Sequence, residues 1–232
     1  MGKNIKSQRR GRATTTYTRP SFNFTADTRI GTDGSAVITE LVHCRAHSAP
    51  LAKIRHEDGS VTFIIAPEGI KSGQEISIGG NTVSNGNVLR LGDIPEGTNV
   101  FSIENVPGDG GKFVKASGLT AKIVAKSQSK VTILLPSKKN KDFNPNCKAI
   151  IGVAAGGGRP EKPFYKAGRK YHRMRAKNMY WPEVCGSSMN AVDHPFGGRS
   201  SHHKGRPTIA PHNAPPGKKV GSIRPRRTGK KR

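Results

Sequence analysis

The final third of the chain is highly charged and almost free of large apolar side chains, which limits how it can fold. Residues 161–232 hold eighteen Lys and Arg against three Asp and Glu, and only seven of these 72 residues are Ile, Leu, Val or Phe. A segment of this composition cannot bury enough apolar surface to offset the entropy lost on folding. We therefore expect it to become ordered only on a polyanion.

Charge is distributed unevenly over the rest of the chain as well. Residues 1–20 hold six basic groups and no acid, whereas residues 21–100 hold six basic and nine acidic groups. Residues 101–160 hold ten basic and three acidic groups, and the whole chain has a formal charge of +25. We infer a folded centre with a basic arm at each end, in a protein whose partner is a polyanion.

Several protein classes are excluded at this stage. The sequence has no run of about 18 apolar residues, which is the length that a bilayer-spanning helix needs. Its basic N-terminus is not followed by the apolar run of a secretory signal. Cys44, Cys147 and Cys185 are odd in number and far apart, so they predict no disulfide framework. We expect a soluble, cytoplasmic protein with no membrane partner.

The central part of the chain breaks into short apolar runs separated by turn residues. Gly, Asn and Asp, which tolerate positive φ, fill separators such as Glu57-Asp58-Gly59 and Asn85-Gly86, and this favours hairpins. The runs are short and rich in Val and Ile, which favours strands over helices. We expect nine strands: Ala36–Val42, Leu51–Arg55, Val61–Ala66, Glu75–Ile78, Val88–Leu91, Val100–Ile103, Leu119–Ala125, Val131–Leu135 and Ala149–Ala154.

Nine short strands fit either one sandwich or two small barrels, and both alternatives are all-β. The charge changes near residue 80, where Gly79-Gly80-Asn81 and Ser84-Asn85-Gly86 also favour a break. We therefore favour two barrels.

One pattern in the first half has the spacing of metal ligands. Imidazole and thiolate groups two or three residues apart can bind zinc, as His43, Cys44 and His47 are spaced. A structural zinc site needs a further ligand pair, yet the chain has no CxxC and Cys147 is the only later thiol near a barrel. We interpret Cys44 as a half-buried cysteine at a strand end.

Two glycine-rich stretches precede a cation but do not form a nucleotide-binding loop. Gly108–Gly111 before Lys112 does not match G-x-x-x-x-G-K-[ST], because Val106 takes the place of the first glycine and Phe113 follows the lysine. Gly156–Gly158 precedes Arg159 and opens no βαβ unit. We expect turns whose backbone can approach a phosphate closely.

Residues 162–180 are the one helical candidate. On a helix, Lys166, Arg169, Lys170, Arg173 and Lys177 would form a cationic stripe. The opposite face is not apolar, which disfavours a membrane-surface helix. Such a stripe, with aromatic side chains nearby, can follow a phosphate backbone while the rings stack on bases.

Residues 189–198 form the most distinctive part of the tail. Asp193 beside His194 could suggest a general base, with Ser187 or Ser188 as nucleophile, but no scaffold surrounds them to hold that geometry. The tail histidines are also too widely spaced for a metal site. A compact turn that inserts into RNA fits better, because Pro fixes φ, Gly permits close approach, and His and Phe can stack.

Ten residues from Met189 to Gly198, with the sequence MNAVDHPFGG, resemble the signature of the universal large-subunit ribosomal protein L-two family in its archaeal and eukaryotic form. Further matching pieces run in family order along the whole chain. They are Gly2-Lys3, Gln8 to Arg12, Ala66 to Gly69, Ile94 to Gly97, Ala116 to Gly118, Leu135 to Ser137, Asn144 to Cys147, Gly156 to Arg159, Glu161 to Pro163 and Asn213 to Gly217.

The resemblance implies an OB-type barrel followed by an SH3-like barrel, with basic extensions ordered on RNA. We divide the chain into a basic N-terminal arm at 1–34, the OB-type RNA-binding barrel at 35–82, the SH3-like barrel at 83–160 and the basic C-terminal extension at 161–232. Arg199 and the pair Cys185 with Ser187-Ser188 depart from the family pattern, so the path beside His194 could differ locally.

The function implied is structural rather than enzymatic: a primary rRNA-binding constituent of the large ribosomal subunit. Implied partners are large-subunit rRNA, small-subunit rRNA at a subunit bridge, neighbouring ribosomal proteins and, indirectly, tRNA. The resemblance implies support of subunit association, of tRNA binding and of the architecture of the peptidyl-transferase centre. The histidine that maps onto His194 is then near the catalytic RNA without being the catalyst. We expect no cofactor of the chain's own, so that any magnesium at the interface belongs to the rRNA.

We expect RNA contacts from basic residues of both arms, from two cations of the centre and from the loop around His194. These are Lys3, Arg9, Arg10, Arg12, Lys115, Arg159, Lys166, Arg169, Lys170, Arg173, Arg175, Lys177, Asn190, Asp193, His194, Arg199, His202, His203, Lys218, Lys219, Arg226 and Arg227. Two rival interpretations are a protein that coats duplex DNA and a metal hydrolase built on the tail histidines.

Overall fold

The chain forms two compact units in a computed structural model that describes residues 2–13, 17–18, 24–199, 213 and 215. One unit combines Met1–Pro20 with Tyr165–Arg232, and the other is Ser21–Phe164. We call the first the terminal unit and the second the β unit.

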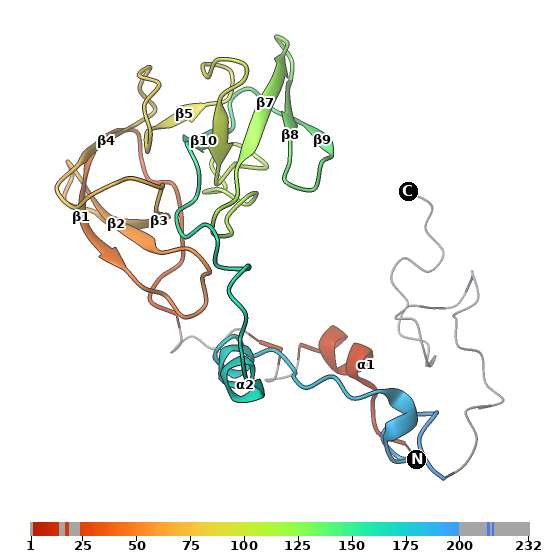
Figure 1. The fold of residues 1–232 in the computed structure, drawn as a ribbon. Helices are drawn as coiled ribbons and strands as arrows, with labels where there is room; N and C mark the ends of the chain where they lie inside the picture. Colours follow the sequence, from red (N-terminus) through yellow and green to blue (C-terminus); the bar gives the residue numbers. More distant parts are fainter. Residues whose placement is uncertain (1, 14–16, 19–23, 200–212, 214, 216–232) are drawn as a thin grey trace. The chain divides into compact units, whose positions relative to one another are not determined.

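The β unit consists of strands, which confirms the prediction of an all-β fold (Figure 1). Its strands are β1 (Gly34–Val42), β2 (Leu51–His56), β3 (Val61–Ile65), β4 (Glu75–Ile78), β5 (Val88–Arg90), β6 (Asn99–Phe101), β7 (Ala121–Lys126), β8 (Val131–Leu134), β9 (Asn140–Phe143) and β10 (Lys148–Ile151). Nine of them overlap the nine predicted runs. The exception is β9, which pairs with β8 from Val131↔Phe143 to Leu134↔Asn140.

The strands follow one another in a continuous hydrogen-bonded order, β3-β2-β1-β4-β5-β10-β6-β7-β8-β9. Neighbours pair antiparallel except β4 and β5, which meet in parallel at Ile78↔Val88. The first six strands of this order close into a ring, because the segments that directly follow β3 and β10 are hydrogen-bonded to each other. There Glu68 N–H donates to Val153 O (2.9 Å) and Ala155 N–H donates to Ala66 O (2.9 Å). This closure removes sheet edges, as a barrel does.

Strands β5 and β10 form a wall shared by two hydrophobic cores. Because side chains alternate between the faces of a strand, the paired residues Val88 and Ile150 face the first core. Leu89 and Ala149, the next pair, face the second core. Two cores on opposite faces of one wall agree with two barrels and not with a single sandwich.

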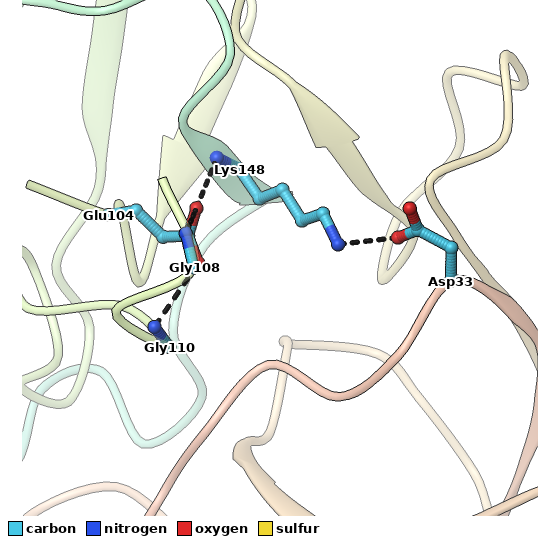
Figure 2. A network of polar contacts seen from close by, with 5 residues as sticks. All are labelled: Asp33, Glu104, Gly108, Gly110 and Lys148. Carbon is cyan, nitrogen blue, oxygen red and sulfur yellow. Dashed lines mark hydrogen bonds and ion pairs between the residues drawn. The ribbon is translucent and has the colours of Figure 1, made fainter. Parts of the chain in front are cut away.

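A polar network fastens the loop after β6 to the rest of the β unit (Figure 2). The buried carboxylate of Glu104 accepts the backbone N–H groups of Gly108 (3.2 Å), Gly110 (3.1 Å) and Lys148 (2.8 Å). The Lys148 ammonium forms an ion pair with Asp33, the residue before β1. The loop, the start of β10 and the entry to β1 are therefore held together.

The terminal unit contains short helical elements. They are α1 (Lys6–Gly11), α2 (Ala167–Ala176) and the 3-10 turn η2 (Gly186–Ser188). The described helices include none with the length and apolar character needed to cross a membrane. α2 lies inside the predicted range 162–180, whereas α1 was not predicted. The proposed division at 34, 82 and 160 stays a prediction.

Candidate nucleic-acid interface

α2 is a polar helix with no buried side chain. Its Ala, Arg, Lys and Met residues favour a helix intrinsically, so the sequence forms one without an apolar face to pack. Arg173 and Arg175 lie in its last turn, where cations interact favourably with the helix dipole. A helix without a buried face is available to a partner from several sides.

Aromatic rings accompany the cations of α2. The ammonium of Lys170 lies 5.7 Å from the centre of the Trp181 ring. Tyr171 and His172 form an edge-to-face pair with centroids 5.6 Å apart, and both side chains are exposed. The surface thus offers positive charge for phosphates and open rings for bases.

Backbone hydrogen bonds fold residues 189–198, which we call the signature loop, into a compact turn. Asp193 N–H and His194 N–H both donate to Asn190 O, at 2.9 and 3.2 Å, and Gly198 N–H donates to Met189 O at 3.2 Å. A side chain at Gly197 would collide with the backbone of Asn190. Glycine is therefore required where the two ends of the loop approach each other.

The ring of His194 is held inside this loop rather than projecting freely from it. Its Nδ1 accepts the backbone N–H of Phe196 (3.0 Å), and the two rings meet edge to face with centroids 5.3 Å apart. A Cβ at Gly186 would lie 2.5 Å from His194 Cε1, so the glycine gives the ring its space.

These contacts determine which His194 nitrogen can act. Burial, and to a smaller extent the charge of Lys6, lowers the pKa of His194, so the neutral ring is favoured. Because Nδ1 accepts a hydrogen bond, the neutral ring carries its proton on Nε2. Nε2 is then a hydrogen-bond donor, which is the opposite of what a general base requires.

The N-terminal arm contacts the C-terminal extension within the terminal unit. Lys3 N–H donates to Val192 O (2.7 Å), and Lys3 Nζ lies 3.3 Å from Asp193 Oδ1. The Lys6 ammonium lies 4.8 Å from the centre of the Tyr180 ring. Lys3 and Lys6 of the arm thus contact the extension.

The two predicted cations of the β unit differ in their surroundings. Lys115 Nζ donates to Thr28 O (3.3 Å) and Gly111 O (3.2 Å), and burial lowers the pKa of this lysine. Its ammonium therefore ties backbone segments together. Arg159 is exposed and donates from Nε to Ser117 Oγ (3.0 Å).

Cys44 is fully buried in the first core, so the expectation of a half-buried cysteine was wrong, and its Sγ lies 3.1 Å from His47 Nδ1. Burial raises the pKa of the Cys44 thiol, but backbone hydrogen bonds from Thr25, His47 and Ala46 outweigh it, so the net shift is downward. Within the described parts of the chain, no three His, Cys, Asp or Glu side chains are grouped to hold a metal ion.

Comparison with known proteins identifies the family to which the chain belongs. Residues 2–78 match the family model described as "Ribosomal Proteins L2, RNA binding N-terminal domain", and residues 84–214 match "Ribosomal Proteins L2, C-terminal domain". The chain belongs to the L2 family. Among its relatives, the large ribosomal subunit protein uL2 of Archaeoglobus fulgidus is 48% identical over 100% of both chains. That of Haloarcula marismortui is 46% identical over 99% of this chain and 98% of the relative, and that of Methanothermobacter thermautotrophicus is 47% identical over 100% of both.

Membership of the L2 family confirms the resemblance inferred from the signature loop. The family is named for a ribosomal constituent and not for an enzymatic activity. The metal-hydrolase interpretation of the tail histidines is therefore dropped.

The predicted RNA-contacting residues of this L2 family member fall into three groups. Within the terminal unit the structure describes Lys3, Arg9, Arg10, Arg12, Lys166, Arg169, Lys170, Arg173, Arg175, Lys177, Asn190, Asp193, His194 and Arg199. Lys115 and Arg159 belong to the β unit. His202, His203, Lys218, Lys219, Arg226 and Arg227 lie outside the described residues.

Sequence reasoning noted Tyr180 beside the cationic stripe but did not single out Lys6 or Trp181 as site residues. Lys6 was overlooked because α1 was not predicted, although its spacing from Arg10 is that of one helix face. Trp181, directly after the predicted helical range 162–180, was a signal that could have been used.

Proposed function

We propose that the chain is a structural constituent of the large ribosomal subunit that binds its rRNA. The match of residues 2–78 to a domain described as RNA binding, within a full-length family match, carries this proposal. The exposed cations and rings of α2 and the compact signature loop supply the chemistry that such binding needs. Its place is the ribosome of the cytoplasm.

Affinity in this proposal comes mainly from the phosphates. Each Lys or Arg that neutralises a phosphate releases condensed counterions, and the released ions increase entropy. The eighteen basic groups of residues 161–232 are the main source of this term. Specificity comes from RNA shape and from unstacked bases that meet exposed rings such as Tyr171.

His194 acts in this proposal through Nε2–H and through its ring face. The nitrogen donates a hydrogen bond to an RNA acceptor, while the Phe196 amide holds Nδ1 in place. Peptide-bond chemistry stays with the RNA, and the signature loop supports the architecture of the peptidyl-transferase centre.

The finer partners extend the same proposal. We assign contacts to small-subunit rRNA at a subunit bridge, to neighbouring ribosomal proteins and, indirectly, to tRNA. The chain needs no cofactor of its own in this role, and magnesium at the interface would be bound to the rRNA.

A binding comparison tests the proposal. Full-length protein is titrated with folded large-subunit rRNA and with duplex DNA of equal length at one salt concentration. We expect the rRNA to bind at least about tenfold more tightly, since irregular RNA presents loops that a uniform duplex lacks. Equal affinities would support the alternative of a protein that coats duplex DNA.

A further inference from the structure

The C-terminal extension has three acidic residues, and two of them pair with the N-terminal arm. Of Glu161, Glu183 and Asp193, Asp193 pairs with Lys3 at 3.3 Å and Glu183 with Arg10 at 4.0 Å. Each pair is exposed and alone stabilises little. Together they match the two acids with cations from the opposite end of the chain.

Backbone hydrogen bonds reinforce the same contact. Lys3 N–H donates to Val192 O at 2.7 Å, and Lys6 Nζ donates to Val184 O at 3.2 Å. Lys6 and Arg10 are four residues apart on α1 and so point from one face of the helix. The arm therefore follows the extension over residues 183–193.

An apolar anchor fixes the start of α1. Ile5 is only 7% exposed, and it is the one buried apolar side chain among the described residues of the terminal unit. Its backbone N–H donates to Gln8 Oε1 (3.2 Å), which stabilises the first turn. Ile5 lies between Lys3 and Lys6, so both lysines are presented from a fixed segment.

We propose that residues 3–10 position the signature loop and that Lys3 is the positioning residue. Lys3 holds two consecutive residues of the loop, Val192 through its backbone and Asp193 through its side chain. His194 follows directly. The proposal rests on the RNA-binding function above and deepens it: the arm neutralises the acids of the extension and keeps the His194 ring in the conformation that the RNA meets.

Carbodiimide crosslinking tests the contact itself in the full-length protein, free and bound to large-subunit rRNA. The reagent activates a carboxylate, and a touching amine displaces it to form an amide with net loss of water. We expect a crosslinked peptide that joins Lys3 to Asp193 in the complex. A Lys3→Arg variant, which keeps the charge but presents no reactive amine, should lose the crosslink. Absence of the Lys3–Asp193 product from the wild-type complex would overturn the proposal.

A charge-reversal cycle tests the consequence for binding. Simple electrostatics predicts that Asp193→Lys tightens rRNA binding, because a negative charge near phosphates becomes positive. The positioning role predicts the opposite sign. We expect Lys3→Asp and Asp193→Lys each to weaken binding by about three- to tenfold, and the double reversal to return within about twofold of wild type.

Matched variants separate positioning from charge. Lys139→Asp makes the same change of charge at an exposed residue outside the predicted RNA contacts and without an ion pair to any described residue, and should have a smaller effect than Lys3→Asp. Lys3→Arg should bind within about twofold of wild type. Additive effects, with Asp193→Lys binding more tightly, would refute the positioning role. Failure of the wild type to prefer rRNA would instead refute the proposed function, and the crosslink would still test the contact.

Discussion

Replacing Glu104 with Gln tests the polar network of Figure 2 and should destabilise the β unit. The side chain is 1% exposed, and its Oε2 accepts two backbone N–H groups, from Gly108 and Lys148, while Oε1 accepts one from Gly110. A glutamine amide keeps one oxygen. In its better orientation that oxygen retains the two bonds, and the new NH2 group points at the Gly110 N–H.

The cost follows from this geometry. One hydrogen bond to a charged acceptor is lost, at about 1.5–3 kcal/mol, and the buried Gly110 N–H faces another donor. We expect the free energy of unfolding to fall by about 2–4 kcal/mol in total. At about 2–4 °C per kcal/mol for a chain of this size, Tm should fall by about 5–15 °C.

Calorimetry and urea unfolding followed by circular dichroism measure the loss, and amide exchange at Gly110 and Lys148 locates it. Glu96→Gln is the matched control, since the exposed Glu96 carboxylate accepts only the Lys126 N–H among the bonds seen. It should cost less than about 1 kcal/mol. A Glu104→Gln effect no larger than that of Glu96→Gln would show that the network is not what holds the loop.

Four further predictions concern the two units. The pKa of His194 should lie below the ordinary value of about 6.5 in an NMR titration, so the conformation of the signature loop should be intact above that pH and lost as pH falls toward the lowered pKa. His194→Gln should cost about 1–3 kcal/mol of RNA contact while assembled subunits keep a near-normal single-turnover rate of peptide-bond formation; a hundredfold slower rate would indicate a general base. Gly118→Ala should lower stability by about 2–4 kcal/mol in thermal unfolding, because φ is +70° and the new Cβ would lie 2.6 Å from Gly157 Cα; an unchanged Tm would show that the two loops part easily. Deleting residues 161–232 should flatten a slope of roughly −6 to −8 in log K against log[salt], expected if half of their basic groups meet phosphates; an unchanged slope would place the main binding surface elsewhere.

Most strands could be predicted because their residues alternate or form short Val- and Ile-rich runs. β9 could not, since its sequence Asn140-Lys141-Asp142-Phe143 has a single apolar side chain. It is a strand because β8 supplies a pairing partner along its whole length, and tertiary pairing overrides weak local preference.

The shared wall was also beyond sequence reasoning. Pairing of Leu89 with Ala149 joins residues 60 positions apart, and nothing local to either run indicates that contact. The run predicted over 149–154 ended earlier, at Ile151, because Gly152 takes a positive φ of +114°.

The candidate site was predictable where composition carried the signal. Charge density identified α2, and the order of Pro and Gly identified the signature loop. The contacts of Lys3 and Arg10 with the extension were not predictable, because each is an exposed cation whose partner lies more than 170 residues along the chain. Because these partners are so distant in the sequence, Lys3 and Arg10 were expected only to contact phosphates. That role, and the ordering of the two arms on RNA, stay predictions.

Sedimentation of tagged full-length protein tests the central claim most directly. Expressed in cells of an archaeon related to the organisms above, the protein should appear in the large-subunit fraction of a sucrose gradient, and dissociating the subunits should leave it there. Protein that remains at the top of the gradient, or that follows chromosomal DNA instead, would contradict a structural role in the large subunit.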